Sequence, residues 1–324
     1  MDISTLHITE PTWDDHHEQL VNNPFSYLKE QTEGKNLRKL LIETFNQLYQ
    51  IPPEKLVKLS EIINYLHLSS LIIDDIEDDS KLRRGKPCSH LIFGVPQAIN
   101  SSNYTYFKAM QLLNDFFCED PKKNFKAQQI FMDEMINLHR GQGLDLYWRD
   151  NGQCPDESEY ISMVMNKTGG LFRLSIKLLN LLAGHEEYTK LVELSNLLGI
   201  VYQIKDDYLN LKSPVYNSNK GFCEDITEGK FSFPIIHSIN ADPKNKELIS
   251  VLRLHTSDVE LKRYCLEVME KTDSFTYTTE TIEKLKQKTV SLIEDVMKEY
   301  IADDEKRESV RGIFLQALLK IVTL

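Results

Sequence analysis

The chain has 324 residues, of which 41% are hydrophobic, and its 49 acidic and 38 basic residues give it a net charge of −11. This acidic balance argues against a general binder of nucleic acids or anionic membranes, because both classes present basic surfaces. Five scattered cysteines without a C-x-x-C pair are typical of reduced thiols rather than of a disulfide framework or a zinc site.

The N-terminal segment and the hydropathy pattern bear on location. The first residues are polar and acidic, unlike a signal or transit peptide. No apolar stretch approaches the roughly 18 residues of a membrane span, because charged residues interrupt the longest runs. We therefore expect a soluble, cytoplasmic protein without a membrane anchor.

Helical periodicity dominates the chain. Apolar residues recur at three- and four-residue steps over 37–50, until Pro52 and Pro53 break the pattern. Further helices are expected at 54–79, 96–117, 124–150, 157–183 and 188–211, with several shorter ones from about residue 232 to the end. Gly169 and Gly170 weaken the helix at 157–183 and allow a kink. No segment alternates as a strand would, so the sequence predicts an all-α fold.

Two connections between the predicted helices are polar. Residues 80–88 carry four cations directly after an acidic helix end, and residues 212–230 form a long loop rich in turn residues. Loops of that length in a compact domain are often lids. We expect a single domain, with an N-terminal extension at 1–33, the chemical motifs at 34–240 and further helices at 241–324.

An acidic cluster ends the helix predicted at 54–79. The string LIIDDIEDDS contains Asp74, Asp75, Glu77, Asp78 and Asp79. On a helix Asp74 and Asp78 lie on one face about 5–6 Å apart, where like charges repel. An isolated acidic run is more often a solvated helix end, but carboxylate oxygens so placed also suit Mg²⁺ that is shared with substrate phosphates. Arg83 and Arg84 follow at once, which favours a clamp for a diphosphate.

A second acidic cluster ends the helix predicted at 188–211. Asp206 and Asp207 are followed by Asn210, whose amide oxygen can stand in for a third carboxylate. Two such clusters, each after an apolar helix, suggest opposing walls of one cavity. A metal ion held between them would favour the departure of a diphosphate.

Several lysines flank the two clusters. Lys167 and Thr168 precede the paired glycines, and Lys220 and Lys230 lie on the long polar loop. Taken singly, each lysine is more often a solvated surface residue. As a set beside two acidic clusters, they favour the binding of phosphate.

These residues resemble the trans-prenyltransferases, in particular the eukaryotic geranylgeranyl diphosphate synthases. The matching strings, in the expected order, are GKNLR (34–38), LHLSSLIIDDIED (66–78), LRRG (82–85), NLHRGQGLDLYWRD (137–150), MNKTGGLF (165–172), YQIKDDYLN (202–210) and EDITEGKFSFP (224–234). The resemblance implies a helical bundle around a deep central cavity.

The resemblance also implies roles for individual residues. The residues that look like the isopentenyl diphosphate site are Lys35, Arg38, His67 and Arg84. Those that look like ligands of the allylic diphosphate are Arg83, Lys167, Lys220 and Lys230. The expected Mg²⁺ ligands, for three ions in each site, are Asp74, Asp78 and Asp206. Thr168 and Gln203 would present oxygens to an allylic cation, and Asn210, in place of an aspartate found in much of the wider family, casts little doubt on metal binding.

The implied reaction joins isopentenyl diphosphate to an allylic diphosphate. Metal-assisted ionisation gives an allylic cation, the isopentenyl double bond attacks it, and a proton is lost to the leaving diphosphate. Farnesyl diphosphate is the expected primer and geranylgeranyl diphosphate the expected product. The resemblance implies a homodimer or a larger homo-oligomer, and no nucleic-acid partner is expected.

Product length is expected to depend on the residues one turn before Asp74. They are Ser69 and Ser70, which are small and lie about 6–7.5 Å deeper along the helix. Bulky aromatic residues there would stop growth at fifteen carbons, so the floor of the cavity is expected to lie deeper. The candidates by resemblance are Tyr106, Phe107 and His139, although from the sequence alone they are equally well plain core residues.

Two other functions have to be weighed against this one. A terpene cyclase shares the fold and the first acidic motif, but it normally carries a second motif of the N-D-x-x-S-x-x-x-E kind, which the segment after Asp206 does not supply. A regulatory subunit of a prenyl synthase typically loses one metal motif, whereas this chain has both. A di-iron bundle needs Glu-x-x-His pairs, and the sequence has none.

Overall fold

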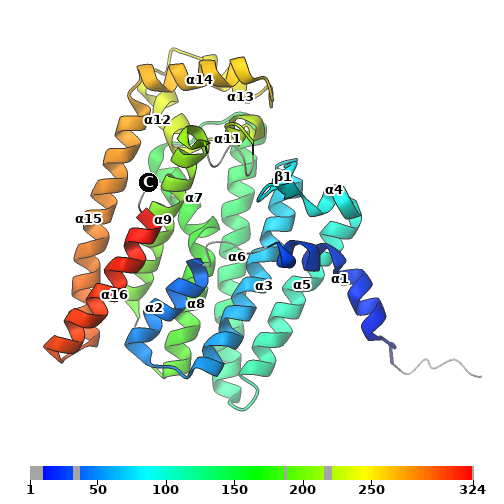
Figure 1. The fold of residues 1–324 in the computed structure, drawn as a ribbon, viewed down its shortest axis with the longest axis vertical. Helices are drawn as coiled ribbons and strands as arrows, with labels where there is room; N and C mark the ends of the chain where they lie inside the picture. The colour runs from blue at the N-terminus through cyan, green and yellow to red at the C-terminus, as the bar shows by residue number, and fades with distance from the viewer. Residues whose placement is uncertain (1–9, 32–36, 186–187, 215–220, 323–324) are drawn as a thin grey trace, which may run out of the picture.

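The computed structural model describes residues 10–31, 37–185, 188–214 and 221–322. This part of the chain is almost wholly helical (Figure 1), which confirms the predicted all-α fold. The helices are α1 (Asp15–Glu30), α2 (Leu37–Tyr49), α3 (Pro53–Glu77), α4 (Ser89–Phe93), α5 (Val95–Phe116), α6 (Pro121–Asn151), α7 (Glu157–Lys167), α8 (Gly169–Ala183), α9 (Thr189–Lys212), α11 (Glu224–Glu228), α12 (Phe233–Ala241), α13 (Glu247–Leu252), α14 (Val259–Lys271), α15 (Ser274–Tyr300) and α16 (Asp304–Val322).

Two helical segments differ from the predictions. The expected helix at 157–183 is interrupted at Thr168, directly before the paired glycines, so the kink becomes a break between α7 and α8. The expectation of only shorter helices after residue 232 is wrong, because α15 has 27 residues. Its buried face includes Thr278 and Thr289, so polar residues interrupt the apolar pattern that a search for periodicity depends on.

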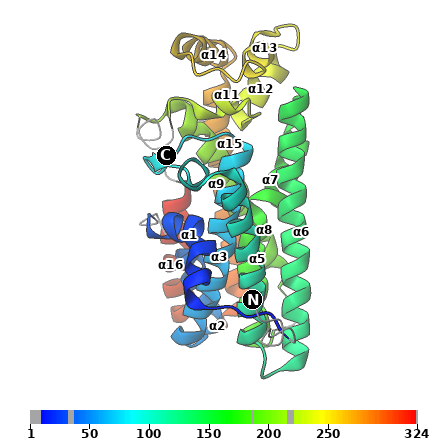
Figure 2. The same ribbon diagram turned by 90° about the vertical axis from the view of Figure 1, so that its right-hand side faces the viewer.

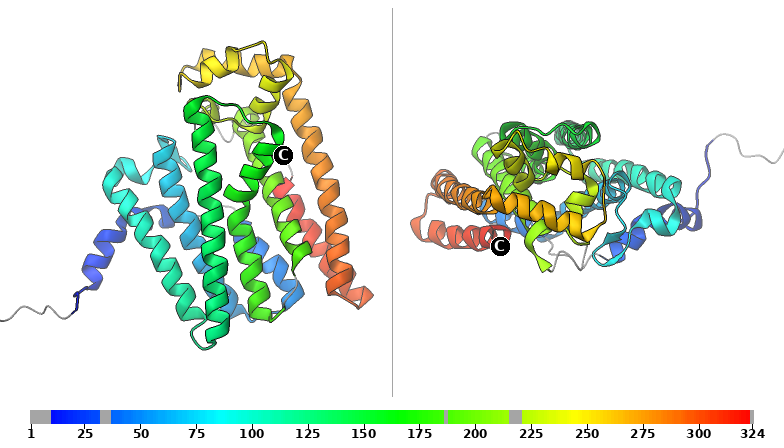
Figure 3. Two further views of the ribbon diagram at one scale, coloured as in Figure 1. Left: turned by 180° about the vertical axis from the view of Figure 1, so that it is seen from behind. Right: turned by 90° about the horizontal axis from the view of Figure 1, so that it is seen from above.

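The helices form an upright bundle with a cap at one end. The C-terminal ends of α3, α6 and α9 all point to the upper end in Figure 1, where α11 to α14 lie across the bundle (Figure 3, right). α6 runs along nearly the whole height of the bundle at its outer edge (Figure 2). Buried side chains of α2, α3, α8 and α9, such as Ile42, Ile63, Leu174 and Val201, share one hydrophobic core with α15 and α16. This packing brings the ends of α3 and α9, and with them both acidic clusters, to the same region.

The cationic connection after α3 is a small hairpin rather than an irregular loop. Strands β1 (Leu82–Arg83) and β2 (Lys86–Pro87) pair antiparallel, so the prediction of no strand fails in this detail. Arg84 and Gly85 form the two-residue turn with φ values of 57° and 75°, the left-handed conformation that tight hairpins require. The turn therefore fixes where the two consecutive arginines point.

α3 is the one helix, within the described residues, whose length and composition would allow it to cross a membrane. The sequence analysis expected no such stretch. A core helix of a soluble protein passes the same test, and α3 packs against α1, α2, α5 and α8. It also carries Asp74 and Asp75 in its last turns, and we therefore interpret it as a core helix of the bundle.

Candidate active site

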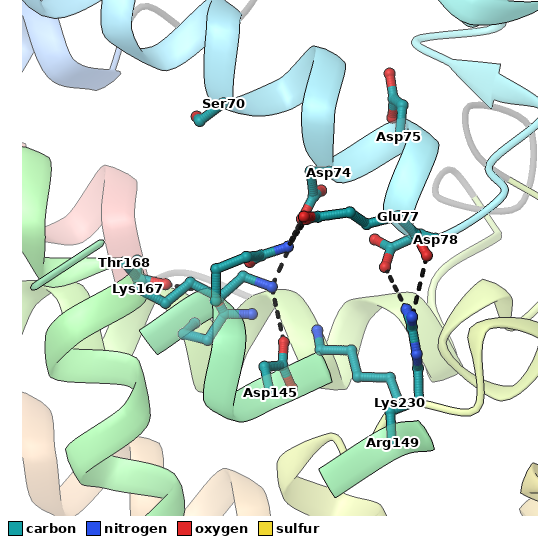
Figure 4. Close-up of polar contacts among 12 residues, drawn as sticks. Ser70, Asp74, Asp75, Glu77, Asp78, Asp145, Arg149, Lys167, Thr168 and Lys230 are labelled. Atoms are coloured by element: carbon teal, nitrogen blue, oxygen red, sulfur yellow. Dashed lines mark hydrogen bonds and ion pairs between the residues drawn. The ribbon is translucent and has the colours of Figure 1, made fainter. Parts of the chain in front are cut away.

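The carboxylates at the end of α3 face a row of polar side chains on α6 (Figure 4). Gln142 Nε2 donates to Asp74 Oδ1 at 3.2 Å and to Glu77 Oε2 at 2.7 Å. Arg149 Nη1 donates to Asp78 Oδ1 at 2.8 Å, and Arg149 also binds the carbonyl of Glu77 at 3.0 Å. Asp74 and Asp78 thus share one face of α3, as predicted.

The row on α6 was missed by the sequence analysis. Gln142, Asp145 and Arg149 are spaced by three and four residues, so they lie on one helical face. That spacing was a usable signal, because all three lie in a segment already singled out for its resemblance. Gly141 lies on the same side, where a Cβ atom would collide with the backbone of Lys167. The glycine therefore lets α6 approach the end of α7 closely.

Lys167 links the first acidic cluster to α6. Its Nζ lies 2.7 Å from Asp145 Oδ2 and 3.6 Å from Asp74 Oδ1, and Figure 4 shows the side chain between the two carboxylates. Burial alone would lower the pKa of Lys167, but Asp145 and Asp74 raise it above its ordinary value. The lysine is therefore a permanent cation in the site.

The carboxyl group of Asp78 lies in an environment that disfavours its negative charge. Burial raises its pKa well above the usual range, and the charges of Asp74 and Glu228 raise it further, against the opposing effect of Lys167 and Arg149. A carboxylate in such a position is stabilised by any additional cation. This donor chemistry fits a divalent metal ion near Asp74 and Asp78.

Asp75 has a different role from Asp74. It is buried on the opposite side of α3, where Arg83 binds it through Nε at 2.7 Å and through Nη2. Arg83 Nη2 also lies 3.3 Å from Asp74 Oδ2. The structure shows that Arg83 fastens the hairpin to the acidic end of α3; its expected role in binding the allylic diphosphate stays a prediction.

The second acidic cluster divides in the same way. Asp207 is fully buried and accepts four hydrogen bonds, from Tyr160 Oη at 2.6 Å, Gln203 Nε2 at 2.9 Å, Lys230 Nζ at 3.0 Å and the backbone N–H of Phe233 at 2.9 Å. Asp206, by contrast, is only partly buried. In both clusters the second aspartate is thus buried and bound to a cation, and the first is more exposed.

The side chain of Asn210 has a structural partner. It is buried, and its amide oxygen accepts a hydrogen bond from the backbone N–H of Asp225 at 3.1 Å. This contact holds α11 against α9. The neutral metal ligand that the sequence suggested at this position stays a prediction.

Thr168 and Gln203 are brought together, as expected of residues with a common task. Thr168 Oγ1 donates to Gln203 Oε1 at 2.7 Å, and Gln203 in turn donates to Asp207. Because the Thr168 hydroxyl gives its hydrogen to Gln203, its lone pairs remain available to a neighbouring positive charge. The break between α7 and α8 places this hydroxyl next to Lys167.

Arg38, His67 and Arg84 lie close together and close to Arg83, which binds the first acidic cluster. In the described part of the chain, Arg38 Nε and Arg84 Nη1 are buried without a hydrogen-bond partner. Burial, together with the charge of Arg84, lowers the pKa of Arg38 to about 10. Burial together with the three nearby arginines Arg38, Arg84 and Arg83 also holds the pKa of His67 well below its ordinary value. Buried donors of this kind require an anion, and an anionic group of a substrate would meet that need.

The residues expected to limit product length differ in how far they are buried. Tyr106 and His139 are partly buried, with their rings 5.7 Å apart in a T-shaped arrangement, and burial raises the pKa of Tyr106 with Glu77 and Asp74 nearby. Phe107 is 77% exposed on α5, so it does not line the interior of the single chain as expected. Ser69 is buried against α5, where its carbonyl accepts from Ser102 at 2.8 Å.

Two predicted residues, Lys35 and Lys220, lie outside the described residues. Within the described ranges no group of three or more His, Cys, Asp or Glu side chains is gathered closely enough to bind a metal ion by itself. Asp74 and Asp78 therefore form only part of a coordination shell. Oxygens from another source, such as a substrate diphosphate, would have to complete it.

Comparisons with known proteins agree with this geometry. A family model described as polyprenyl synthetase matches residues 18–269. The chain is 46% identical over 302 residues to a geranylgeranyl pyrophosphate synthase of Fusarium fujikuroi, which covers 93% of this chain and 69% of that protein. It is 49% identical over 281 residues to a geranylgeranyl pyrophosphate synthase of Macrophomina phaseolina, covering 86% of this chain and 84% of the relative.

A third relative is much longer than this chain. The chain is 45% identical over 320 residues to a copalyl diphosphate synthase of Talaromyces verruculosus. The match covers 99% of this chain but only 32% of that protein, so the chain spans about a third of its length.

The two aspartates of the second cluster should respond differently to substitution. Asp207→Ala leaves the buried cation Lys230 without its closest partner, and we expect the free energy of unfolding to fall by about 3–5 kcal/mol. Asp206→Ala should change it by less than about 1 kcal/mol while abolishing activity. Urea unfolding at a fixed protein concentration measures both variants, and a larger loss for Asp206→Ala contradicts this division of roles.

Proposed function

The chain belongs to the polyprenyl synthetase family, and on this premise we propose that it condenses farnesyl diphosphate with isopentenyl diphosphate to give geranylgeranyl diphosphate. Relatives named as geranylgeranyl pyrophosphate synthases, at 46% to 50% identity, support this product. The observation that carries the proposal is the group of Arg38, His67 and Arg84, in which both arginines have buried donors without a partner and which lies close to Arg83 at the first acidic cluster. The arginine group suits a diphosphate without metal ions, and the acidic clusters suit a diphosphate that is bound through metal ions.

The chain's own residues account for most steps of this reaction. Arg38, His67 and Arg84 would bind the diphosphate of isopentenyl diphosphate, and Lys167 and Lys230 that of the primer. The C–O bond of the primer breaks with its electron pair on the leaving diphosphate, and the isopentenyl double bond then forms the new C–C bond. A proton from the adjacent carbon passes to the released diphosphate. Thr168, whose hydroxyl donates its hydrogen to Gln203 and so keeps its lone pairs available, would stabilise the allylic cation.

Prenyl synthases of this family generally depend on divalent metal ions. For this chain we propose Mg²⁺, three ions in each site, bound through Asp74, Asp78 and Asp206. When bound, the ions supply Lewis-acid stabilisation of the departing diphosphate. The burial of Asp78 and its proximity to Asp74 and Glu228 support this assignment, because these carboxylates gain from added positive charge.

We also propose that the protein is cytoplasmic and forms a homodimer. All five cysteines are free, in keeping with a reducing compartment. An apolar stripe along the outer face of α6 supports the dimer, and its exposed members are Phe125, Met132, Ile136, Leu144 and Tyr147. The stripe runs for about 33 Å along a helix that Figure 2 shows at the edge of the bundle. Such a stripe on a long straight helix suits the same face of a second copy.

The reaction is tested by product analysis. Purified protein is incubated with Mg²⁺, labelled isopentenyl diphosphate and each allylic primer in turn, and the products are separated by chain length. We expect a twenty-carbon diphosphate with farnesyl diphosphate, and none after chelation of the metal. A fifteen-carbon product would support the condensation reaction but refute geranylgeranyl diphosphate as its product. Cyclic hydrocarbons without condensation would indicate a cyclase, and no reaction with any primer would favour a regulatory subunit.

Product length is tested by substitution around the interior. Ser70 lies one turn before Asp74 (Figure 4), so Ser70→Phe should shift the main product to fifteen carbons. Tyr106→Ala and His139→Ala should give longer chains, because both rings would then no longer close the cavity. Phe107→Ala is the matched control, since its side chain is exposed and its product should be unchanged. Normal products from both Tyr106→Ala and His139→Ala would refute the assignment of the floor.

The dimer is tested by placing charge on the apolar stripe. Light scattering should give twice the chain mass for the natural protein, and Ile136→Glu should yield monomers because a carboxylate would be buried between the copies. Val57→Glu provides the control, since Val57 is 67% exposed on α3, away from α6. A monomeric natural protein, or an Ile136→Glu variant that still forms dimers, would exclude this interface.

A further inference from the structure

A buried arginine lies directly beneath the break between α7 and α8. Arg173, in the second turn of α8, is only 7% exposed and contacts neither acidic cluster. Its Nε donates to Glu134 Oε2 of α6 at 2.9 Å, and its Nη2 lies 2.8 Å from the same oxygen. Its Nη1 donates to the Met165 carbonyl of α7 and to Asn196 Oδ1 of α9, the latter at 2.8 Å. One guanidinium thus joins three helices at the break.

The contact with Met165 is specific to the end of a helix. The last carbonyls of a helix lack amide partners within it, and Met165 lies in the last turn of α7. Gly169 leaves room for the donor, because a Cβ atom there would lie 2.8 Å from Arg173 Nη1. Arg173 therefore touches the break on both sides, at Met165 and at Gly169. Lys167 and Thr168 are the two residues between these points that reach into the site.

The anchor of Arg173 is itself rigid. Glu134 is 1% exposed, and its other oxygen is bound by Lys177 Nζ at 2.7 Å. Glu134 and Asp145 belong to the same helix, and Asn196 and Gln203 share another. The helices that hold Arg173 are thus the ones that carry the partners of Lys167 and Thr168.

We infer that Arg173 is a positioning residue for the transfer reaction, which sets the break so that Lys167 faces Asp74 and Asp145 and Thr168 faces Gln203. The inference rests on the proposed function. A planar guanidinium carries five donors on three separate nitrogens and so spans acceptors on three helices, whereas the donors of an ammonium group all sit on one nitrogen and cannot reach acceptors that far apart. Loss of the Met165 and Asn196 contacts would let Lys167 and Thr168 shift, and small displacements of positioning groups reduce rates by up to about a hundredfold.

The test compares Arg173→Lys with Lys177→Met. Arg173→Lys keeps a positive charge near Glu134 but cannot bind Met165 and Asn196 together. Lys177→Met removes the other cation from Glu134 and leaves the break untouched, so it is the matched control. We expect Arg173→Lys to lower kcat by about ten- to a hundredfold and to raise KM for the allylic diphosphate, with KM for isopentenyl diphosphate unchanged. Lys177→Met should keep all three parameters within about twofold of the natural protein.

Further measurements separate positioning from folding. Thermal unfolding is followed for both variants. If each variant loses activity only in proportion to its loss of stability, the inference is overturned. It is also overturned if Arg173→Lys has the same kcat and KM values as the natural protein. If Arg173→Lys does not fold, Asn196→Ala, which removes one of the contacts of Nη1, carries the same comparison.

One more measurement keeps the inference distinct from the proposed function. If the natural protein shows no condensation, the proposed function fails. Calorimetry with Mg²⁺ and inorganic diphosphate then tests the inference without turnover. Weaker binding by Arg173→Lys than by Lys177→Met would support positioning of Lys167, and equal binding would overturn it.

Discussion

The neutralisation of buried carboxylates is the constraint on which the rest of the structure depends. α3 and α9 each carry a pair of aspartates near the C-terminal end, Asp74 and Asp75 in the last turn of α3 and Asp206 and Asp207 in the turn before the last of α9. In each pair the second aspartate is buried and bound to a cation from a later segment, Arg83 in one case and Lys230 in the other. Each ion pair also fixes the segment that supplies the cation. The hairpin after α3 and the chain after α11 are therefore positioned by the same contacts that make the acidic clusters tolerable.

The first aspartates are balanced by cations that come from other helices. Lys167 lies between Asp74 and Asp145, and Arg149 binds Asp78. These contacts depend on the approach of α6 to the end of α7, which Gly141 permits. The result is a region of alternating charge close to the two arginines Arg38 and Arg84, which have buried donors without a partner. Two diphosphates that differ in their need for metal ions can be distinguished by these two environments.

Much of this arrangement could be predicted from the sequence, and the misses have physical reasons. Periodicity located the long helices up to α9 but not α15, and the paired glycines marked the break. The different fates of neighbouring aspartates were also encoded, since Asp75 continues the buried stripe of Leu68 and Ile72, and Asp207 that of Ile200 and Ile204. The role of Asn210 could not be predicted, because it depends on Asp225 in a distant segment. Phe107 was misplaced because an apolar residue on a helix gives no sign of which side is covered.

Two opposite faces of α6 have different tasks, and this limits which changes in its sequence and length the protein can tolerate. Gln142, Asp145 and Arg149 occupy its inward face, while an apolar stripe beginning at Phe125 runs along its outward face. Each residue advances a helix by about 100°, so a single insertion or deletion after Phe125 would rotate the rest of the helix against the part before it, and the polar row or the apolar stripe would no longer lie on its side of the bundle. We therefore expect length variation among descendants to fall outside Phe125–Arg149. Within that span, change is confined to substitutions in the two narrow strips between the faces.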